Sequence, residues 1–247
     1  MHFSYEEAVD YILDVPRFTK KNVPEDTEHF FDFLGRPGER AKIVHVAGTN
    51  GKGSVCAFVT SVLERAGIST GLFSSPHLVD IRERFRLNGE MISREAFASC
   101  LNRVMDSLEL FRAETGKAEY HPTFFELLFF MGMLWFSDQK AEAIVLETGM
   151  GGRLDATNVV RRPAVCVITR IGLDHMEYLG DTKEKIAAEK AGIIRPGVPV
   201  VFWDEDPSVS RVIVEKAKKI DAETIPVSEE EVGFFNFKNK TVDFSMR

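Results

Sequence analysis

The stretch from residue 43 to residue 55 constrains the fold more than any other part of this sequence. The apolar run Ile43 to Ala47 predicts a buried strand, two glycines bracket a turn, and Lys52 opens a pattern typical of a helix. In such a unit, free backbone N–H groups and the positive end of the helix dipole point at a bound anion. We therefore predict that a phosphate group binds to seven consecutive residues: Gly48, Thr49, Asn50, Gly51, Lys52, Gly53 and Ser54.

Two side chains of this loop carry the chemistry. Lys52 would neutralise the terminal phosphates of a nucleotide, and the Ser54 hydroxyl could bind a magnesium ion. The spacing differs from the general P-loop, because Gly53 separates the lysine from the hydroxyl residue and Gly48 lies too close to the lysine. The alternative is a plain glycine turn with a solvated lysine, but glycine, lysine and hydroxyl together favour nucleotide binding.

Composition and charge indicate a soluble globular protein. Hydrophobic residues make up 44% of the 247 residues, enough for a sizeable core, and the net charge of −7 argues against a nucleic-acid partner. Cys56, Cys100 and Cys166 are far apart and lack CxxC spacing, which favours a reduced, cytoplasmic protein over a disulfide framework or zinc site. The most apolar stretch, Phe124 to Phe136, falls short of the roughly 20 residues that a membrane span needs. The N-terminus has no apolar signal core.

Short apolar runs alternate with helical patterns along the chain. The predicted strands are residues 43–47, 70–73, 143–146, 165–169, 198–202 and 224–227. Runs that are apolar throughout are typical of parallel strands buried on both faces. The sequence therefore predicts an α/β fold, a mostly parallel sheet with helices on both faces. Residues 234–237 and 241–244 predict a small antiparallel pair near the C-terminus, and Asn88-Gly89 a tight turn.

Helical patterns fill the intervals between these strands. The predicted helices are residues 5–13, 52–66, 93–116, a buried helix after Pro122, 181–192 and 207–219. Asp181 and Glu184 resemble a capping box with Asp in place of Ser or Thr. Residues 14–40 are expected to form a loop, because prolines and glycines interrupt them: Pro16, Pro24, Gly35, Pro37 and Gly38.

Polar residues follow several strands, and ligands of parallel sheets bind beyond the carboxyl ends of strands. Glu147 comes directly after a predicted strand and precedes three glycines that leave the backbone open to a ligand. A carboxylate there suits magnesium, and the alternative is that it caps the following turn. Asp174 and His175 follow the next predicted strand, where His175 could bind a metal or move protons and Asp174 could orient it. By itself, an Asp–His pair in a loop is more often structural or solvated.

A third polar cluster follows the predicted strand 70–73. It begins at Ser74 and is followed by Arg82, Arg84 and Arg86. These arginines could receive a polyanionic substrate, or they could form a solvated edge strand that discourages aggregation. Their spacing alone favours the second interpretation.

Together these segments resemble the folylpolyglutamate synthase/dihydrofolate synthase family, which is related to the Mur peptidoglycan ligases. The resemblance covers nearly the whole chain in order, in residues 45–54, 75–78, 122–126, 147–158, 172–175 and 188–194. The family uses the same Lys-Gly-Ser spacing, and the segment Ser75 to Leu78 separates the folate ligases from the Mur enzymes. The resemblance implies the P-loop NTPase-like fold of the central domain of Mur ligases.

The resemblance also implies a reaction. Family members transfer the γ-phosphate of ATP to a carboxylate of folate or dihydropteroate, and the amine of L-glutamate attacks the acyl phosphate to form an amide, ADP and phosphate. Catalysis of this kind is mostly positioning and neutralisation of charge. Lys52, His175 and Lys190 are the implied catalytic residues, and ATP and two magnesium ions the implied cofactors.

The implied ligand sites follow from the matching positions. Ser54 and Glu147 would hold one magnesium ion and His175 a second. Lys190 matches a lysine that family members carbamylate, although on sequence alone it is a surface lysine of a helix. The folate-side residues would be Ser74, Ser75, Pro76, His77, Leu78 and Glu126, and the supporting residues Asp155, Asn158 and Asp174. The role of Glu126 stays open, but in so apolar a helix the carboxylate must be partnered or functional.

The family has a second, C-terminal α/β domain that closes over the cleft and supplies much of the glutamate site. We expect residues 1–247 to form the N-terminal ATP-binding domain alone, as a monomer, with little amide formation, because an exposed acyl phosphate is hydrolysed. Two other functions compete with the folate ligase. One is a Mur-type ligase acting on a nucleotide-linked peptide, which Gly53 and the segment Ser75 to Leu78 argue against. The other is a nucleotide-binding module without catalysis.

Overall fold

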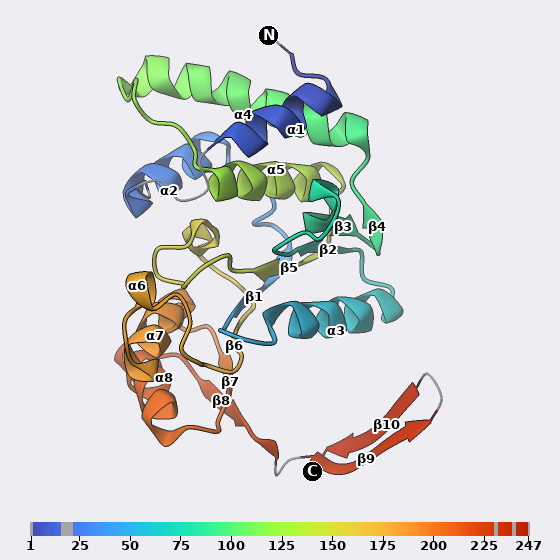
Figure 1. The fold of residues 1–247 in the computed structure, drawn as a ribbon, viewed down its shortest axis with the longest axis vertical. Helices are drawn as coiled ribbons and strands as arrows, with labels where there is room; N and C mark the ends of the chain where they lie inside the picture. Colours follow the sequence, from blue (N-terminus) through green and yellow to red (C-terminus); the bar gives the residue numbers. More distant parts are fainter. Residues whose placement is uncertain (1, 16–21, 230–231, 239–240, 247) are drawn as a thin grey trace.

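A computed structural model describes residues 2–15, 22–229, 232–238 and 241–246, which contain an eight-stranded sheet and a separate two-stranded sheet near the C-terminus (Figure 1). The strands of the larger sheet lie in the order β4 (Glu90–Met91), β3 (Phe85–Leu87), β2 (Thr70–Phe73), β5 (Ala143–Glu147), β1 (Lys42–Ala47), β6 (Val165–Ile168), β7 (Val200–Trp203) and β8 (Thr224–Val227). The strands from β2 to β8 in this order are parallel, and β3 and β4 add an antiparallel edge joined at Asn88-Gly89. The predicted α/β fold with a mostly parallel sheet is confirmed.

The larger helices are α1 (Tyr5–Asp14), α2 (Pro24–Phe33), α3 (Lys52–Arg65), α4 (Arg94–Thr115), α5 (Phe124–Asp138), α7 (Lys183–Lys190) and α8 (Pro207–Lys219). Shorter turns are η1 (Ile81–Arg84), η2 (Ala156–Val159), α6 (Met176–Leu179) and η3 (Ala191–Ile193). The predicted antiparallel pair is present as β9 (Val232–Lys238) and β10 (Thr241–Met246), at the bottom of Figure 1.

The two faces of the sheet are covered unequally. Alternate residues of a strand face opposite sides, and Val46 of β1 packs with Val145 of β5 and Cys56 of α3. The predicted helix over residues 52–66 is therefore confirmed, and α3 covers this face. Phe58 and Val62 of α3 do not join this contact and remain 74% and 68% exposed.

The opposite face carries two separate apolar clusters. Ile43 belongs to a phenylalanine-rich cluster under α1, α2, α4 and α5, whereas Ala47 belongs to a cluster under α7 and α8. His45 lies between these two residues on the same strand and is fully buried. In Figure 1 the first group of helices lies above the sheet, and α7 and α8 lie to the left of it. The polar side chain of His45 thus lies where the two apolar clusters meet.

Helix α5 is buried on nearly every side, as its apolar sequence predicted. The rings of Phe129 and Phe130 pack against those of Phe30 and Phe31 from α2. Neither α5 nor another helix in the described ranges is both long and apolar enough to cross a membrane.

Three local predictions were wrong. Residues 24–33, expected to be part of a loop, form α2. Pro24 opens this helix, because proline is tolerated at the first helical position, and burial of Phe30 and Phe31 stabilises it. The expected Asp181 capping box is also absent, since the Thr182 side chain caps α7 and Asp181 pairs with Lys185. That helix ends at Lys190, two residues before the predicted end.

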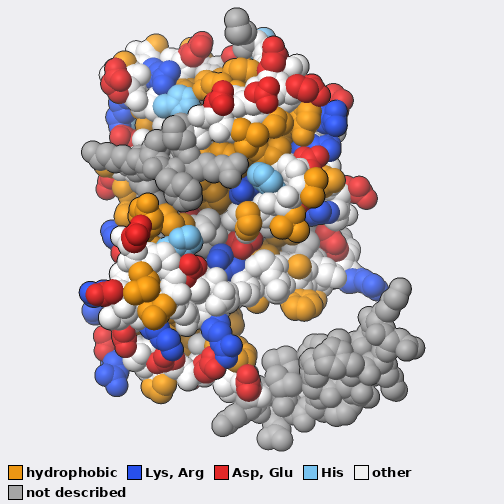
Figure 2. Space-filling model, in the orientation of Figure 1, with side chains coloured by type: hydrophobic (Ala, Val, Ile, Leu, Met, Phe, Trp, Pro, Cys, Tyr) orange, Lys and Arg blue, Asp and Glu red, His pale blue; other side chains and the backbone are white. Residues whose placement is uncertain are grey.

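Charged side chains of both signs are mixed over the face shown in Figure 2, with hydrophobic side chains between them. No large patch of a single sign gathers among the described side chains of that face. Such a surface offers no basic track for a nucleic-acid backbone on the side in view.

The buried phenylalanine cluster predicts a large difference between two Phe-to-Ala substitutions. Phe130→Ala removes a ring with no exposed surface and should lower the free energy of unfolding by about 3–5 kcal/mol. Phe58→Ala, at an exposed position of α3, should change it by less than about 0.5 kcal/mol. Urea unfolding of the two variants and the parent chain measures both values. Equal losses would mean that the phenylalanine cluster is not the principal core.

Candidate active site

The loop between β1 and α3 is fixed to the end of β6. Gly48 has φ +156°, and a Cβ atom there would lie 1.8 Å from the Thr169 hydroxyl oxygen, so no larger residue fits. The backbone N–H groups of Thr49 and Asn50 both donate to the Arg170 carbonyl, at 2.9 and 3.3 Å. These two N–H groups are therefore used within the protein, although they belong to the predicted phosphate loop.

The anion-binding groups that remain are those of the first helical turn. Gly51 precedes α3 in a left-handed conformation, φ +85°, and the first N–H groups of a helix have no intrahelical partner. Ser54 lies in this turn and is exposed. Phosphate binding at this loop stays a prediction, and its available backbone donors would be those of residues 51 to 54.

Two lysine side chains converge on one carbonyl oxygen of this loop. Lys52 Nζ donates to the Gly48 carbonyl at 3.0 Å and Lys190 Nζ donates to the same oxygen at 2.7 Å. Lys190 is only 4% exposed, so the interpretation of this residue as a surface lysine is wrong. Burial, with the nearby charge of Lys52, lowers the pKa of Lys190 to about 8. Asp174 and Asp155 oppose that shift, which places both carboxylates in the neighbourhood of the lysine.

Glu147 ends β5 and is 2% exposed. Its Oε2 accepts a hydrogen bond from the Ser75 N–H at 3.1 Å, and a Cβ atom on Gly53 would lie 3.9 Å from the same oxygen. Burial raises the pKa of Glu147, while the Ser75 N–H, Lys52 and Arg84 oppose the rise. The carboxylate therefore lies beside the first turn of α3, with little solvent to stabilise its charge.

These surroundings fit a magnesium ion. Magnesium prefers oxygen ligands and usually keeps several water molecules, so one buried carboxylate beside a phosphate site suffices. Within the described residues no group of three or more His, Cys, Asp and Glu side chains could hold a metal by itself. Such an ion would therefore need the Ser54 hydroxyl or phosphate oxygens in addition to Glu147.

His175 lies at the other side of the loop. It precedes α6 with φ +48°, unusual for a residue with a side chain, and its Nε2 lies 3.7 Å from Asp174 Oδ2. Both side chains are about half exposed, at 47% and 46%. Glu147 ends β5 and His175 follows β6, and these strands are not neighbours in the sheet, because β1 lies between them. The phosphate loop thus leaves the sheet between the strands that precede Glu147 and His175.

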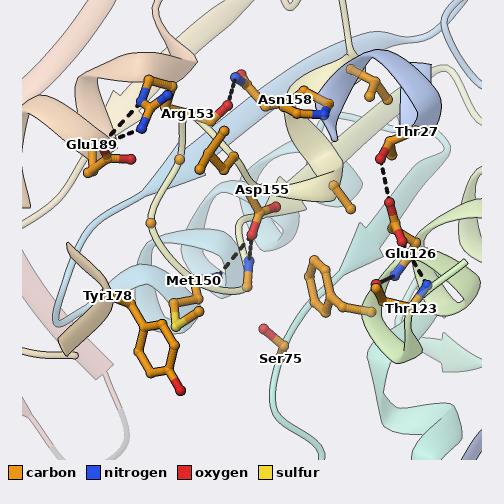
Figure 3. A pocket seen from close by; sticks show the side chains of 18 of the residues that line it. Thr27, Ser75, Thr123, Glu126, Met150, Arg153, Asp155, Asn158, Tyr178 and Glu189 are labelled. Carbon is orange, nitrogen blue, oxygen red and sulfur yellow. Dashed lines mark hydrogen bonds and ion pairs between the residues drawn. The ribbon is translucent and has the colours of Figure 1, made fainter. Parts of the chain in front are cut away.

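A cavity of about 650 Å³ adjoins the phosphate loop (Figure 3). Lys52, Ser75 and His175 line it on the loop side, and residues 149–156 form a continuous part of its wall. Figure 3 shows Glu126 with Thr27 and Thr123 on one side and Arg153 with Glu189 on the opposite side. The predicted phosphate loop and the cavity therefore share Lys52.

Glu126 has a structural role in this wall, because it connects α5 to α2. Its carboxylate accepts hydrogen bonds from the Thr123 N–H at 2.7 Å, from Asn22 at 2.8 Å and from the Thr27 hydroxyl. It completes a capping box for α5 with Thr123 and ties α5 to α2. Its partners explain how the carboxylate survives in so apolar a helix. The prediction that it contacts a substrate stays a prediction.

The segment predicted as the substrate loop lies at the cavity edge. Ser75 and Pro76 line the cavity, and His77 Nδ1 accepts a hydrogen bond from Arg84 Nε at 2.8 Å. Leu78 is 88% exposed, and its N–H donates to Glu83 at 2.8 Å. The Ser74 N–H donates to the backbone carbonyl of Arg84, at 3.1 Å.

The three arginines differ in their surroundings. Arg84 is 6% exposed and lines the cavity, with its guanidinium 5.6 Å from the Phe124 ring centre. Arg82 pairs with Asp80, and Arg86 donates to the Gly89 carbonyl. The solvated-edge interpretation therefore fails for Arg84, which the spacing of the arginines could not reveal.

Two of the predicted supporting residues hold loops together. Asp155 accepts hydrogen bonds from the Gly149 and Met150 N–H groups, both at 2.9 Å. Asn158 donates to the carbonyls of Arg153 and Gly192, at 3.0 and 3.3 Å, and accepts from Arg195. The sequence did not indicate Arg195, Thr169 or the cavity-lining residues of α2, because their importance depends on distant partners.

The chain is similar to known proteins over most of its length. Residues 46–246 match the family model described as the Mur ligase middle domain. A folylpolyglutamate synthase of Arabidopsis thaliana is 41% identical over 231 residues, covering 88% of this chain and 39% of that protein. A dihydrofolate synthase/folylpolyglutamate synthase of Bacillus subtilis is 39% identical over 221 residues, covering 89% of this chain and 50% of that protein.

A solved structure described as an FPGS-AMPPCP-folate complex shares the fold. It superposes with a TM-score of 0.89 at 31% identity, covering 98% of this chain and 58% of that one. The chain thus spans half or less of the length of the two sequence relatives.

The loop after Pro76 predicts a pH-dependent stability. Glu83 accepts the N–H groups of Leu78, Val79 and Asp80, which lower its pKa to about 2. A lowered carboxyl pKa adds stability that is present above the unfolded-state value and is lost as the pH falls through the folded-state value. Glu83→Gln should therefore be less stable than the parent chain near neutral pH, and the gap should narrow as the pH falls from about 5 to about 3.

Thermal unfolding across this pH range measures the gap, and amide exchange at residues 78 to 80 locates it. Glu90→Gln, at an exposed position of β4, is the matched control and should show no gap. A gap that stays constant with pH would mean that the three N–H groups do not act on the ionised carboxylate.

Proposed function

Because this chain belongs to the folylpolyglutamate synthase family of the Mur ligase superfamily, we propose that it is the ATP-binding part of a ligase that joins L-glutamate to the carboxylate of a folate or dihydropteroate. The names of the two relatives, and the AMPPCP and folate of the solved complex, support this assignment. The substrates and the complete reaction are inferred for the whole protein, since the chain spans only part of its relatives.

One observation carries the proposal. Lys52 belongs to the phosphate loop and also lines the cavity, and the Ser75 N–H that binds Glu147 belongs to a cavity-lining residue. A nucleotide whose phosphates lie on the first turn of α3 would therefore direct its terminal phosphate toward the cavity. An acid bound in that cavity would present its carboxylate to this phosphate, the geometry that phosphoryl transfer requires.

Several residues would have separate roles in phosphoryl transfer. The first N–H groups of α3 and the Lys52 ammonium would bind the phosphates and stabilise charge on the transferred group. Ser54 and Glu147 would hold one magnesium ion and His175 a second. A bound ion would supply positive charge to the phosphate oxygens.

We also propose that Lys190 is carbamylated in the active protein. Carbamylation adds CO₂ to the neutral amine with loss of one proton to solvent, and the lowered pKa of Lys190, about 8, makes the neutral amine accessible near physiological pH. The product would replace an ammonium group beside Lys52 by an anion and relieve the repulsion between the two cations. Its oxygens would then serve as a ligand for the second magnesium ion.

The cavity would receive the folate. Phe124 and Phe125 provide aromatic surface, and Arg84 provides a buried positive charge near Glu147. Aromatic rings suit a planar heterocycle, and a guanidinium suits a carboxylate. We place the protein in the cytoplasm as a monomer, and the three buried, unpaired cysteines support a reducing compartment.

Binding experiments on the 247-residue chain test the proposal. Lys52→Ala should weaken binding of magnesium–AMPPCP by about 1.5–3 kcal/mol, roughly tenfold or more, because a charged hydrogen bond is lost. The affinity for folic acid should change much less, because Lys52 lines the cavity only on its phosphate-loop side. Lys218→Ala, on the exposed side of α8, is the control and should leave both affinities unchanged.

Isothermal titration measures each affinity, and the outcomes separate the candidate functions. Unchanged nucleotide affinity in Lys52→Ala would contradict the phosphate site. Binding of a nucleotide-linked peptide in place of folic acid would indicate a Mur-type ligase. Nucleotide binding without any acid substrate would indicate a module without catalysis.

The carbamylation proposal has its own test. In ¹³C-bicarbonate, the parent chain should show a carbamate carbon signal that disappears in Lys190→Ala. Lys183→Ala, an exposed lysine on the same helix, should retain the signal. A signal that persists in Lys190→Ala would assign the carbamate to another amine.

A further inference from the structure

His45 is a fully buried polar residue at the centre of the sheet, and neither the phosphate loop nor the cavity lining includes it. Its Nε2 lies 2.8 Å from the Thr157 hydroxyl oxygen. That hydroxyl lies 2.6 Å from Asp155 Oδ1. Thr157 is also fully buried, and Asp155 is 7% exposed and lines the cavity. A chain of three buried polar groups thus leads from β1 to the cavity wall.

The number of available protons determines which group donates and which accepts in this chain of hydrogen bonds. A threonine hydroxyl has one proton, and an ionised carboxylate accepts hydrogen bonds only. Thr157 must therefore donate to Asp155, and its oxygen must accept from His45. This requires the proton of the neutral imidazole to be on Nε2. Nδ1 is then an acceptor, and it has no hydrogen-bond partner within the described residues.

The imidazole stays neutral in the folded protein. Burial lowers the pKa of His45 to about 3, and the positive charge of Arg195 adds to the shift. A neutral ring with a fixed tautomer donates one hydrogen bond in one direction. The fold therefore fixes the donors and acceptors of these hydrogen bonds, and they do not change with pH in the physiological range.

The Asp155 carboxylate connects these hydrogen bonds to the cavity wall. Its Oδ1 also accepts the Thr157 N–H at 3.0 Å, and its Oδ2 accepts the Gly149 and Met150 N–H groups (Figure 3). Four hydrogen bonds thus fix the carboxylate. The turn that they hold, residues 149–150, lines the cavity directly after β5.

We propose that His45 and Thr157 are positioning residues, which orient the Asp155 carboxylate and through it hold the Gly149–Met150 turn in the shape that receives the acid substrate. The inference rests on the proposed function for the identity of that substrate. It assigns no contact between His45 and the substrate.

A role in filling the core does not explain this arrangement. An unpartnered Nδ1 in a buried ring costs stability, and an apolar side chain would occupy the same seam between the two cores without that cost. The polar chain also ends at a cavity-lining turn. The unpartnered Nδ1 of His45 thus lowers the stability of the fold at a residue that supports the cavity wall.

Thr157→Val and Thr157→Ser form the test pair. Valine keeps the shape of threonine but removes the hydroxyl, and serine keeps the hydroxyl. Thr157→Val should raise the dissociation constant of folic acid at least fivefold and change that of magnesium–AMPPCP less than twofold. Amide exchange at Gly149 and Met150 should become faster. Thr157→Ser should restore all three values to near those of the parent chain.

Nitrogen-15 NMR of the parent chain reads the tautomer directly and needs no ligand. His45 should show a protonated Nε2 and an unprotonated Nδ1. A proton on Nδ1 would overturn the proposal, as would unchanged amide exchange in Thr157→Val. Equal loss of folic acid and nucleotide binding in a folded Thr157→Val would also overturn it, because the effect would then not be confined to the cavity wall.

These readouts separate this inference from the proposed function. If the parent chain binds nucleotide but not folic acid, the assigned substrate is wrong, while amide exchange and the tautomer still decide the positioning role. If Thr157→Val does not fold, the His45 tautomer in the NMR spectrum of the parent chain decides it.

Discussion

The carbonyl oxygen of Gly48 is the point on which the candidate active site depends. It accepts hydrogen bonds from both Lys52 and Lys190, and so brings two positive charges together in a largely buried place. Glu147, also desolvated, lies beside the same helix end. Such an arrangement is unfavourable for a protein alone, since buried charges lose solvation and like charges repel. Clustered, desolvated charges of this kind are typical of functional sites, which supports the proposed phosphate site.

The order of the strands explains how these groups meet. β1 lies between β5 and β6, so the phosphate loop leaves the sheet between the strand that ends at Glu147 and the strand that leads to His175. Thr169, just after β6, packs so closely on Gly48 that only glycine fits. The site is thus formed by the ends of three neighbouring parallel strands, as expected for ligand sites in open α/β sheets.

Local sequence patterns predicted what depends on local physics. Apolar runs predicted the parallel strands, and Ser93 with Gly116 predicted the bounds of α4. Helix α2 was missed because its stability comes from burying Phe30 and Phe31 under α5, a contact far away in sequence. The burial of Lys190 was missed for the same reason, since α7 is polar and gives no sign of its position. Only resemblance to a family indicated its role. The partners of Glu126 and the surroundings of Arg84 likewise depend on segments that the fold brings together.

The central strand β1 supports both the predicted phosphate loop and the cavity wall. Its end carries Gly48 and therefore the phosphate loop, while His45, two residues before the end of β1, supports the cavity wall through Thr157. Because side chains of a strand alternate between faces, His45 and Ala47 face the cavity side and Val46 packs under α3. A displacement of β1 along its axis would thus move the phosphate loop and the cavity wall together. The pairing of β1 with β5 and β6 on both sides resists such a displacement. The pairing of β1 therefore constrains the predicted phosphate loop and the cavity wall together.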